Sequence, residues 1–379
     1  MSLVIKDIRH FGLRFEIGAK NAYGNARGLR TARSLSVVIV ETKDGTIGYG
    51  EAYGPPQPTA AYLDLVKPHF IGREIWDRDQ IWHRLYDEHY HLGLQNQMTA
   101  ALGAINIALF DILGKEAGEP LCKLLGGRRL DEIPAYASTG FFTPDPLPGL
   151  ERQMKAIVGH GFGATKIKIG RSPADDEARV KRAREIVGPD MLLMVDVNAN
   201  YTVDATLDSA RRIAPYGIHW YEEPLPPTDF EGYREIRARS PIRIATGEAL
   251  YTAHDLKRLI DGRCVDFVQP DLTMCGGLDE GRLIAKLAYL ANLKLTPHVW
   301  GGAVGLAAAV HFVAALPASP QTDIEAFPNF IEYDRSESPL RDDLAINPVV
   351  AVKGRIAVPT TPGLGVELDM KAVERYRIA

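Results

Sequence analysis

The 379-residue sequence predicts an α/β protein in which a smaller α+β domain precedes a closed barrel of parallel strands. Three observations lead to this fold class. Roughly the first 125 residues place strand patterns before helical patterns, the order of an α+β domain. After residue 131, short β-branched segments alternate with amphipathic segments about every 25 residues. Ionisable residues follow these segments at the same period, as at a barrel mouth. A doubly wound open sheet is the competing topology.

The first domain contains two strand patterns and a long helical region. Residues 2–16 and 34–49 alternate apolar and polar side chains, which predicts antiparallel strands, with a hairpin turn at 43–45. From about 59 to 125 the spacing becomes helical. Within it, the small apolar residues of 100–111 predict a buried helix.

The second part of the chain is expected to supply eight strands and the helices between them. Seven strands are predicted at 133–138, 165–169, 192–197, 219–224, 242–246, 265–270 and 293–297, and helices at 174–187, 204–214, 229–239, 253–261 and 278–291. An eighth strand should lie within 322–333. The expected organisation is a first domain at 1–130, a barrel at 131–354, and a C-terminal segment at 355–379 that leaves the barrel and packs on the first domain.

Composition and charge exclude several classes of protein. With 44 Lys and Arg against 48 Asp and Glu, the formal net charge is −4, so we expect no nucleic-acid partner. The three cysteines form no C-x-x-C pair, which argues against a disulfide framework and a structural zinc site. The longest apolar run, 300–316, is interrupted by His311 and is too short for a membrane span. With no signal-peptide pattern at its start, the sequence predicts a cytoplasmic protein.

Six consecutive predicted strands end at an ionisable side chain: Lys168, Asp196, Glu222, Glu248, Asp271 and His298. Successive positions lie 28, 26, 26, 23 and 27 residues apart, which is the period of the barrel units. A single acidic residue after a strand is more often a helix cap or a solvated loop residue. Six ionisable tips at the repeat period predict one shared site at the barrel mouth.

Three of these tips predict a metal site. Asp196, Glu222 and Glu248 would converge and repel one another unless a cation held them together. A ligand set of carboxylate oxygens, without histidine or thiolate, suits Mg²⁺ better than zinc.

The remaining tips predict proton transfer. Lys166 and Lys168 are two residues apart, so both point into the barrel mouth; two exposed lysines on an edge strand are the alternative. A neighbouring ammonium and a cation lower the pKa of a lysine, so we expect Lys168 to act as a base, with Lys166 depressing that pKa or contacting a substrate carboxylate. Asp271 and His298 follow adjacent strands and are interpreted as a histidine oriented by an aspartate, the alternative being a buried structural pair.

Together these groups predict a reaction class. A divalent ion would bind a substrate carboxylate and offset the charge of its enediolate form. A base on one face would remove the α-proton, and an acid on the other face would return a proton or expel a leaving group.

The motif set resembles the enolase superfamily, mandelate racemase subgroup: K-x-K at 166–168, D-x-N at 196–198, E-E-P at 222–224, G-E at 247–248, Q-P-D at 269–271 and P-H at 297–298. The resemblance implies a (β/α)7β TIM-like barrel under a capping domain built from the N-terminal segment and the C-terminal tail. It also implies Mg²⁺ on the three carboxylates, with Lys168 opposed to the His298–Asp271 dyad. Asn198 and Glu223 are expected to contact the substrate, as is a glutamate near the eighth strand, for which Glu332 fits best and Glu325 is a rival.

Within the subgroup, the sequence is similar to enzymes that act on sugar acids and their lactones, namely acid-sugar dehydratases and galactarolactone cycloisomerases. The resemblance implies a small-molecule carboxylate substrate and a homo-oligomer. Specificity is expected from the loops at 17–30 and 51–58, through Tyr23, Arg27 and Tyr53, and from Trp300. Arg27 would grip a distal carboxylate, although a solvated arginine is an equally good interpretation.

Two other functions remain open at this point. A racemase or epimerase would use both Lys168 and His298, and a catalytically silent binding protein would use neither.

Two other sequence features are weak evidence for a binding site. The glycine-rich run at 159–163 precedes a strand and opens no helix, unlike a nucleotide-binding fingerprint. The histidines at 83, 89 and 91 are interpreted as a solvated helix face in preference to a metal site.

Overall fold

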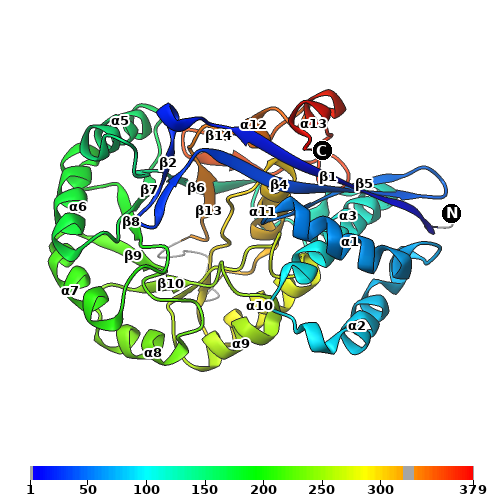
Figure 1. Ribbon diagram of the computed structural model, residues 1–379, viewed down its shortest axis with the longest axis horizontal. Helices are drawn as coiled ribbons and strands as arrows, with labels where there is room; N and C mark the ends of the chain where they lie inside the picture. Colours follow the sequence, from blue (N-terminus) through cyan, green and yellow to red (C-terminus); the bar gives the residue numbers. More distant parts are fainter. Residues whose placement is uncertain (1–2, 319–327, 379) are drawn as a thin grey trace.

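The computed structural model describes residues 3–318 and 328–378 and has two parts (Figure 1). Helices ring a set of parallel strands, and an antiparallel sheet with its own helices lies beside this barrel. The antiparallel sheet has the order β1-β4-β5, with β1 (Ile5–Glu16), β4 (Ala32–Thr42) and β5 (Ile47–Ala52). Its helices are α1 (Pro56–Phe70), α2 (Arg78–Glu88), α3 (Gln97–Ala117) and α4 (Leu121–Leu124). We call the part from β1 to α4 the capping domain.

The capping domain follows the predicted pattern with one addition and one shorter loop: the loop expected at 51–58 is confined to 53–55, because β5 extends to Ala52 and α1 begins at Pro56. The predicted hairpin turn at 43–45 lies between β4 and β5. The loop at 17–30, expected to be irregular, contains a small hairpin of β2 (Tyr23–Asn25) and β3 (Gly28–Arg30). Single short turns of 3-10 helix complete this part at η1 (Ala19–Asn21), η2 (Ile75–Asp77) and η3 (Tyr90–Leu92).

Helix α3 forms the centre of the capping domain because glycines let it approach the sheet closely. A Cβ atom at Gly50 would lie 1.8 Å from the Ala104 carbonyl oxygen, and one at Gly48 would lie 2.1 Å from the Ala108 oxygen. Among the described residues, α3 is the one helix long and apolar enough to cross a membrane, and 94% of its apolar window is buried inside the protein. Such burial is that of a core helix.

The barrel strands follow one another around the sheet in chain order: β6 (Glu132–Ser138), β7 (Ala164–Lys168), β8 (Leu192–Asp196), β9 (Ile218–Glu222), β10 (Ile244–Thr246), β11 (Phe267–Val268), β12 (Lys294–Leu295) and β13 (Ile331–Asp334). The last strand, β13, pairs in parallel with the first, β6. A doubly wound sheet would reverse the strand order at a switch point, so this order rules out that topology. The predicted barrel is therefore confirmed, with β11 and β12 shorter than expected.

The outer helices are α5 (Pro146–Gly159), α6 (Pro173–Val187), α7 (Val203–Ile213), α8 (Phe230–Arg239), α9 (Thr252–Asp261), α10 (Leu278–Leu290) and α11 (Ala303–Ala315), with a short turn η4 (Ala214–Tyr216) after α7. Inside the strands, buried side chains form a separate apolar cluster that includes Tyr136, Met194, Trp220 and Phe267. This cluster fills the barrel interior, so polar groups at the strand tips lie on a packed floor.

The C-terminal residues bond to both parts of the protein. They contain α12 (Pro339–Asp342), β14 (Ala351–Val352), β15 (Arg355–Ala357) and α13 (Met370–Tyr376). The segment expected to leave the barrel at residue 355 begins with β15, which pairs antiparallel with β6 and is therefore still attached to the barrel. The chain then reaches the capping domain, where the Leu121 N–H donates to the Gly363 carbonyl at 2.8 Å.

Candidate active site

Strand register places the first of the predicted site residues at one level of the barrel. On β7 and β8, Lys168 is the register partner of Asp196, and on β8 and β9, Asp196 is the register partner of Glu222. Because parallel strands end at the same side of a barrel, the side chains at their tips project into the same mouth.

Three carboxylates converge at this mouth. Asp196, Glu222 and Glu248 each offer an oxygen, and these oxygens lie within 4.8 Å of one another. Asp196 and Glu222 are fully buried, whereas the Glu248 side chain is 15% exposed. Glu248 Oε2 is buried and has no hydrogen-bond partner among the described residues.

The electrostatics of this cluster fit a divalent cation. Burial raises the pKa of Glu222 to about 8, and the neighbouring carboxylates add to this effect while Lys166 opposes it. Three convergent carboxylates, two of them fully buried, are therefore unfavourable as a charged set unless cationic groups offset their charge. Their all-oxygen ligand set, with one oxygen left unpartnered, suits Mg²⁺.

Two barrel side chains hold Glu222 from below. Its Oε2 accepts from Trp220 Nε1 at 2.8 Å and from Gln269 Nε2 at 2.7 Å. Neither is assigned a role in the sequence analysis, although Gln269 belongs to the Q-P-D motif. Trp220 lies two residues before Glu222 on β9, so the period-2 rule places both side chains on the same inward face. Gln269 follows β11 directly and lies two residues before Asp271.

The two lysines of β7 lie among the carboxylates, as the spacing predicts. The Lys166 ammonium contacts Glu222 and lies 2.9 Å from Glu332 Oε1, while Lys168 donates to Asp196. Burial lowers the pKa of Lys168, but the surrounding carboxylates, Asp196 foremost, together outweigh burial and raise the pKa overall. This differs from the expected lowering, because that expectation assumes a cation beside the lysine. Lys166 acts in the expected lowering direction.

The imidazole of His298 is fixed by Asp271. Its Nδ1 lies 2.7 Å from Asp271 Oδ2, while Asp271 Oδ1 accepts from the Thr273 N–H and hydroxyl. This leaves Nε2 facing the cluster, 3.5 Å from Glu248 Oε1. Burial lowers the pKa of His298, but the surrounding carboxylates, Glu248 foremost, outweigh burial and raise the pKa to about 10.

Glu332 on β13 joins the two sides of the mouth. Its Oε2 accepts from the Val299 N–H at 3.0 Å, and its Oε1 pairs with Lys166. The contact with Val299 connects β13 to the segment that follows β12. The rival residue, Glu325, lies outside the described residues.

Asn198 and Glu223 lie beside the carboxylate cluster in unusual backbone conformations. Their φ angles are 52° and 41°, in the left-handed region that costs free energy for a glutamate. Asn198 Nδ2 lies 3.4 Å from Asp196 Oδ2 and 3.5 Å from Glu223 Oε2. Asn198 Oδ1 has no partner among the described residues, so it is free to accept from a ligand.

The four predicted specificity residues lie where the capping domain meets the barrel, but in different roles. The Tyr53 ring lies edge-on to His298, with centroids 6.1 Å apart, so it borders the dyad. Arg27 is exposed and donates to the Ala199 carbonyl at 3.3 Å, beside the β8 tip. Tyr23 is buried, and its hydroxyl donates to a backbone carbonyl. Trp300 stacks under the Arg33 guanidinium at 4.6 Å.

A further buried carboxylate, missed by the sequence analysis, connects the two parts of the protein. Glu51 on β5 accepts from the Gly302 N–H at 2.6 Å and the Gly305 N–H at 3.1 Å, at the start of α11. Burial raises the pKa of Glu51 to about 7, although these two backbone donors oppose the rise. This carboxylate therefore anchors the segment between His298 and α11 to the capping domain. No local pattern marks it, because its partners are 251 and 254 residues away.

A parallel α/β barrel with ionisable side chains at the carboxyl ends of its strands and a second domain beside it is the architecture of an enzyme. Residues 149–372 match the family described as enolase C-terminal domain-like, and residues 20–126 match the mandelate racemase / muconate lactonizing enzyme N-terminal domain. The chain belongs to the enolase superfamily, in the mandelate racemase subgroup, and the resemblance read from the motifs is confirmed.

Curated relatives cover nearly the whole chain. The D-galactarolactone cycloisomerase of Agrobacterium fabrum is 37% identical over 91% of this chain and 92% of its own. The arabinonate dehydratase of Saccharolobus solfataricus is 30% identical over 99% of both. A crystal structure of a racemase from Streptomyces coelicolor with bound magnesium superposes with a TM-score of 0.88, at 28% identity over 99% of this chain and all of that one. The protein is thus an enzyme of a lyase and isomerase family.

Proposed function

We propose that the enzyme removes the α-proton of a sugar-acid carboxylate or its lactone in a Mg²⁺-dependent reaction. One observation carries the proposal: three convergent carboxylates lie between a lysine at one end and a histidine–aspartate dyad at the other. Lys168 contacts Asp196, the first carboxylate along the barrel, and His298 Nε2 lies 3.5 Å from Glu248, the last. This arrangement supports the proposal that the two groups face the substrate from opposite sides.

Asp196, Glu222 and Glu248 would hold the metal ion. When bound, Mg²⁺ supplies a fixed positive charge against the negative charge that develops on the substrate carboxylate. Magnesium in a solved relative supports this assignment. Asp196 acting as a metal ligand would pair less strongly with Lys168, which would favour the neutral amine that a base requires.

The side chains around the carboxylates are proposed to have different roles in proton transfer and substrate binding. Lys168 and His298 are the acid/base pair, and Asp271 keeps Nδ1 of the imidazole occupied so that Nε2 faces the substrate. Lys166 is proposed to bind the substrate carboxylate, since its ammonium pairs with the carboxylates of Glu222 and Glu332. Glu332 and Asn198 border the same space and are proposed to contact the substrate.

Two outcomes of proton abstraction are proposed for this chain. In dehydration, the C–H bond at the α-carbon breaks, and a β-hydroxyl takes a proton from the acid and leaves as water. In the ring opening of a lactone, the ring oxygen is the leaving group instead. Relatives named for both reactions support this pair.

Epimerisation is the second candidate, because Lys168 and His298 lie on opposite sides of the cluster. One group would remove the α-proton, and the other would deliver a proton to the opposite face. The catalytically silent alternative is not favoured, since every group needed for proton transfer is present and buried at the mouth.

A substrate screen in D₂O tests the proposal. Mono- and di-acid sugars and their lactones are incubated with enzyme and Mg²⁺ and followed by NMR. Loss of water or opening of a lactone, abolished by EDTA and restored by Mg²⁺, is the expected result. Deuterium at the α-carbon with inversion, and no other product, would favour the epimerase. Metal-independent turnover would contradict the metal assignment.

We further propose that the enzyme works in the cytoplasm as a homo-oligomer on this small-molecule substrate. Cys122, Cys264 and Cys275 are all buried and unpaired, which suits a reducing compartment. Size-exclusion chromatography with light scattering checks the oligomeric state.

A further inference from the structure

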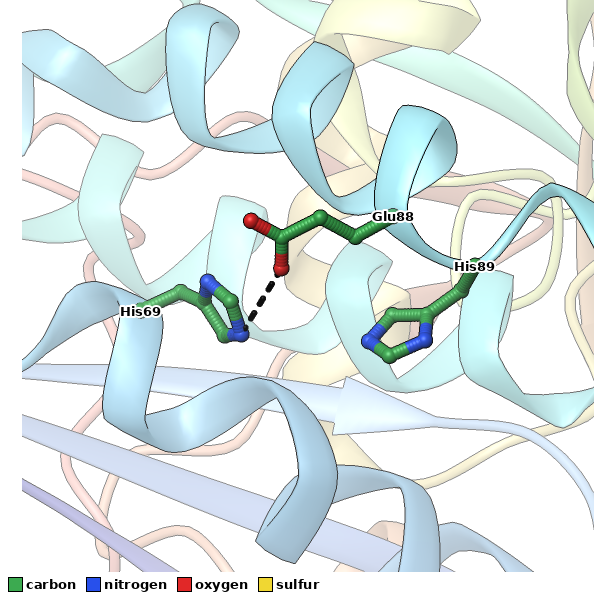
Figure 2. Close-up of side chains that lie close together, drawn as sticks. All are labelled: His69, Glu88 and His89. Atoms are coloured by element: carbon green, nitrogen blue, oxygen red, sulfur yellow. Dashed lines mark ion pairs between the residues drawn. The ribbon is translucent and has the colours of Figure 1, made fainter.

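A second group of potential ligands lies in the capping domain, outside the barrel. His69 is near the end of α1, Glu88 is the last residue of α2, and His89 follows it. One ligand atom from each lies within 4.8 Å of the others, and His69 Nε2 is 3.6 Å from Glu88 Oε2. Figure 2 shows the three side chains converging on one space from two helices.

The ligand atoms of this group are available. His89 Nε2 is buried and has no hydrogen-bond partner among the described residues. An unpartnered buried polar atom costs free energy, so it calls for a ligand. Glu88 Oε1 accepts from Arg84 Nε at 2.6 Å, which leaves Oε2 turned toward His69. The two imidazole rings lie 6.4 Å apart and nearly perpendicular, so their nitrogens do not bond to each other.

The donor set differs from that of the barrel. Two imidazole nitrogens and one carboxylate oxygen are ligands typical of zinc, with a fourth position left for water. Ligands about 2.1 Å from a tetrahedral ion lie about 3.4 Å from one another. The 3.6 Å between His69 and Glu88 is already close to that value. We propose that His69, Glu88 and His89 bind a divalent transition-metal ion of the zinc type.

This site would join two helices that are separate in the sequence. An ion on His69 and His89 links the end of α1 to the end of α2, where a short loop leads into α3. His69 also lines a cavity of about 610 Å³ with Arg73 and Arg84, which makes it reachable from solvent. Since such an ion binds the folded form alone, it should raise the unfolding temperature.

The same structure refines the sequence interpretation of the histidines. His83 and His91 are exposed, in agreement with a solvated helix face. His89 is half-buried and faces His69, 20 residues earlier in the chain. The exposed His83, on the same helix as Glu88, therefore serves as a matched control.

Zinc binding to the full chain tests this proposal. The protein is saturated with Mg²⁺ to fill the barrel site, titrated with ZnCl₂, and analysed by equilibrium dialysis. We expect one zinc per chain, with affinity reduced by roughly 100-fold in His69→Ala and in His89→Ala and unchanged in His83→Ala. An Asp196→Asn background should retain this zinc, which separates it from the barrel carboxylates.

Two further measurements guard against misfolding and chance binding. Co²⁺ in place of zinc should give the intense visible absorption of tetrahedral coordination, lost in the conservative His69→Gln variant. Zinc should raise the unfolding temperature of the wild type and of His83→Ala, but not of His69→Ala. Zinc binding that survives both His69→Ala and His89→Ala, or that falls equally in His83→Ala, would overturn the proposal.

Discussion

The Lys168 ammonium donates to the Asp196 carboxylate across two neighbouring strands on which the residues are register partners. A proposed base and a proposed metal ligand thus share one ion pair. Burial alone would favour neutral forms for both groups, and each keeps its charge through the other. Metal binding and proton abstraction should therefore be coupled through this pair.

Removing the charge of Asp196 should weaken magnesium binding. In Asp196→Asn the cluster loses one of three carboxylates, so we expect the dissociation constant for Mg²⁺ to rise at least about tenfold. Isothermal titration calorimetry measures it. The exposed Asp190→Asn, close to the start of the same strand, is the matched control. Equal affinity in the two variants would remove Asp196 from the ligand set.

Each proposed proton-transfer group should be indispensable for turnover. Lys168→Ala and His298→Asn are expected to abolish kcat on the substrate found by the screen, since general acid–base groups contribute about 100-fold or more. The exposed residues Lys181 and His160, changed to Ala and Asn, are controls. Wild-type kcat in Lys168→Ala or in His298→Asn would show that the residue has no acid/base role.

Glu51 should make stability depend on pH. Its folded-state pKa of about 7 is above the ordinary value of 4.5, so its contribution to stability is complete below pH 4.5 and is lost as the pH rises through 7. Glu51→Gln lacks this titration. The unfolding free energy of the variant relative to wild type should therefore increase by up to roughly 3 kcal/mol from pH 4.5 to pH 8. Urea unfolding at both pH values measures it, and a difference that stays constant would argue against the raised pKa.

Gly50 should be intolerant of any side chain. Gly50→Ala places a Cβ against the Ala104 backbone, so α3 must move away from β5, at a cost of about 2–4 kcal/mol. Thermal unfolding checks this. Gly159→Ala is the control, because that glycine lies at the end of α5 with nothing within 4 Å of the added atom. A Gly50→Ala protein as stable as this control would contradict the packing argument.

The features that could be predicted from the sequence are those in which residue types repeat at a regular spacing. Strand alternation, helical spacing and the repeat of about 25 residues are local patterns, and they were sufficient for the barrel and for the level shared by Lys168, Asp196 and Glu222. Magnesium, the ligand set and the proton-transfer roles remain predictions until the experiments above are done.

The features missed depend on contacts between distant segments. Glu51 meets α11 only after the capping domain and barrel pack together, and β15 returns to β6 although its sequence suggests an element leaving the barrel. His89 faces His69 because α1 and α2 pack, which no spacing reveals. The hairpin of β2 and β3 is too short for alternation to be read.

The bonds from Glu51 to Gly302 and Gly305 bear on how new specificities can be engineered. Consider a chimera that combines the capping domain of one relative with the barrel of another. If its residue 51 were not a glutamate, the N–H groups at the start of α11 would lose their hydrogen-bond acceptor. The strand that carries residue 51 and the segment at 298–305 must therefore be transferred together from the same parent protein.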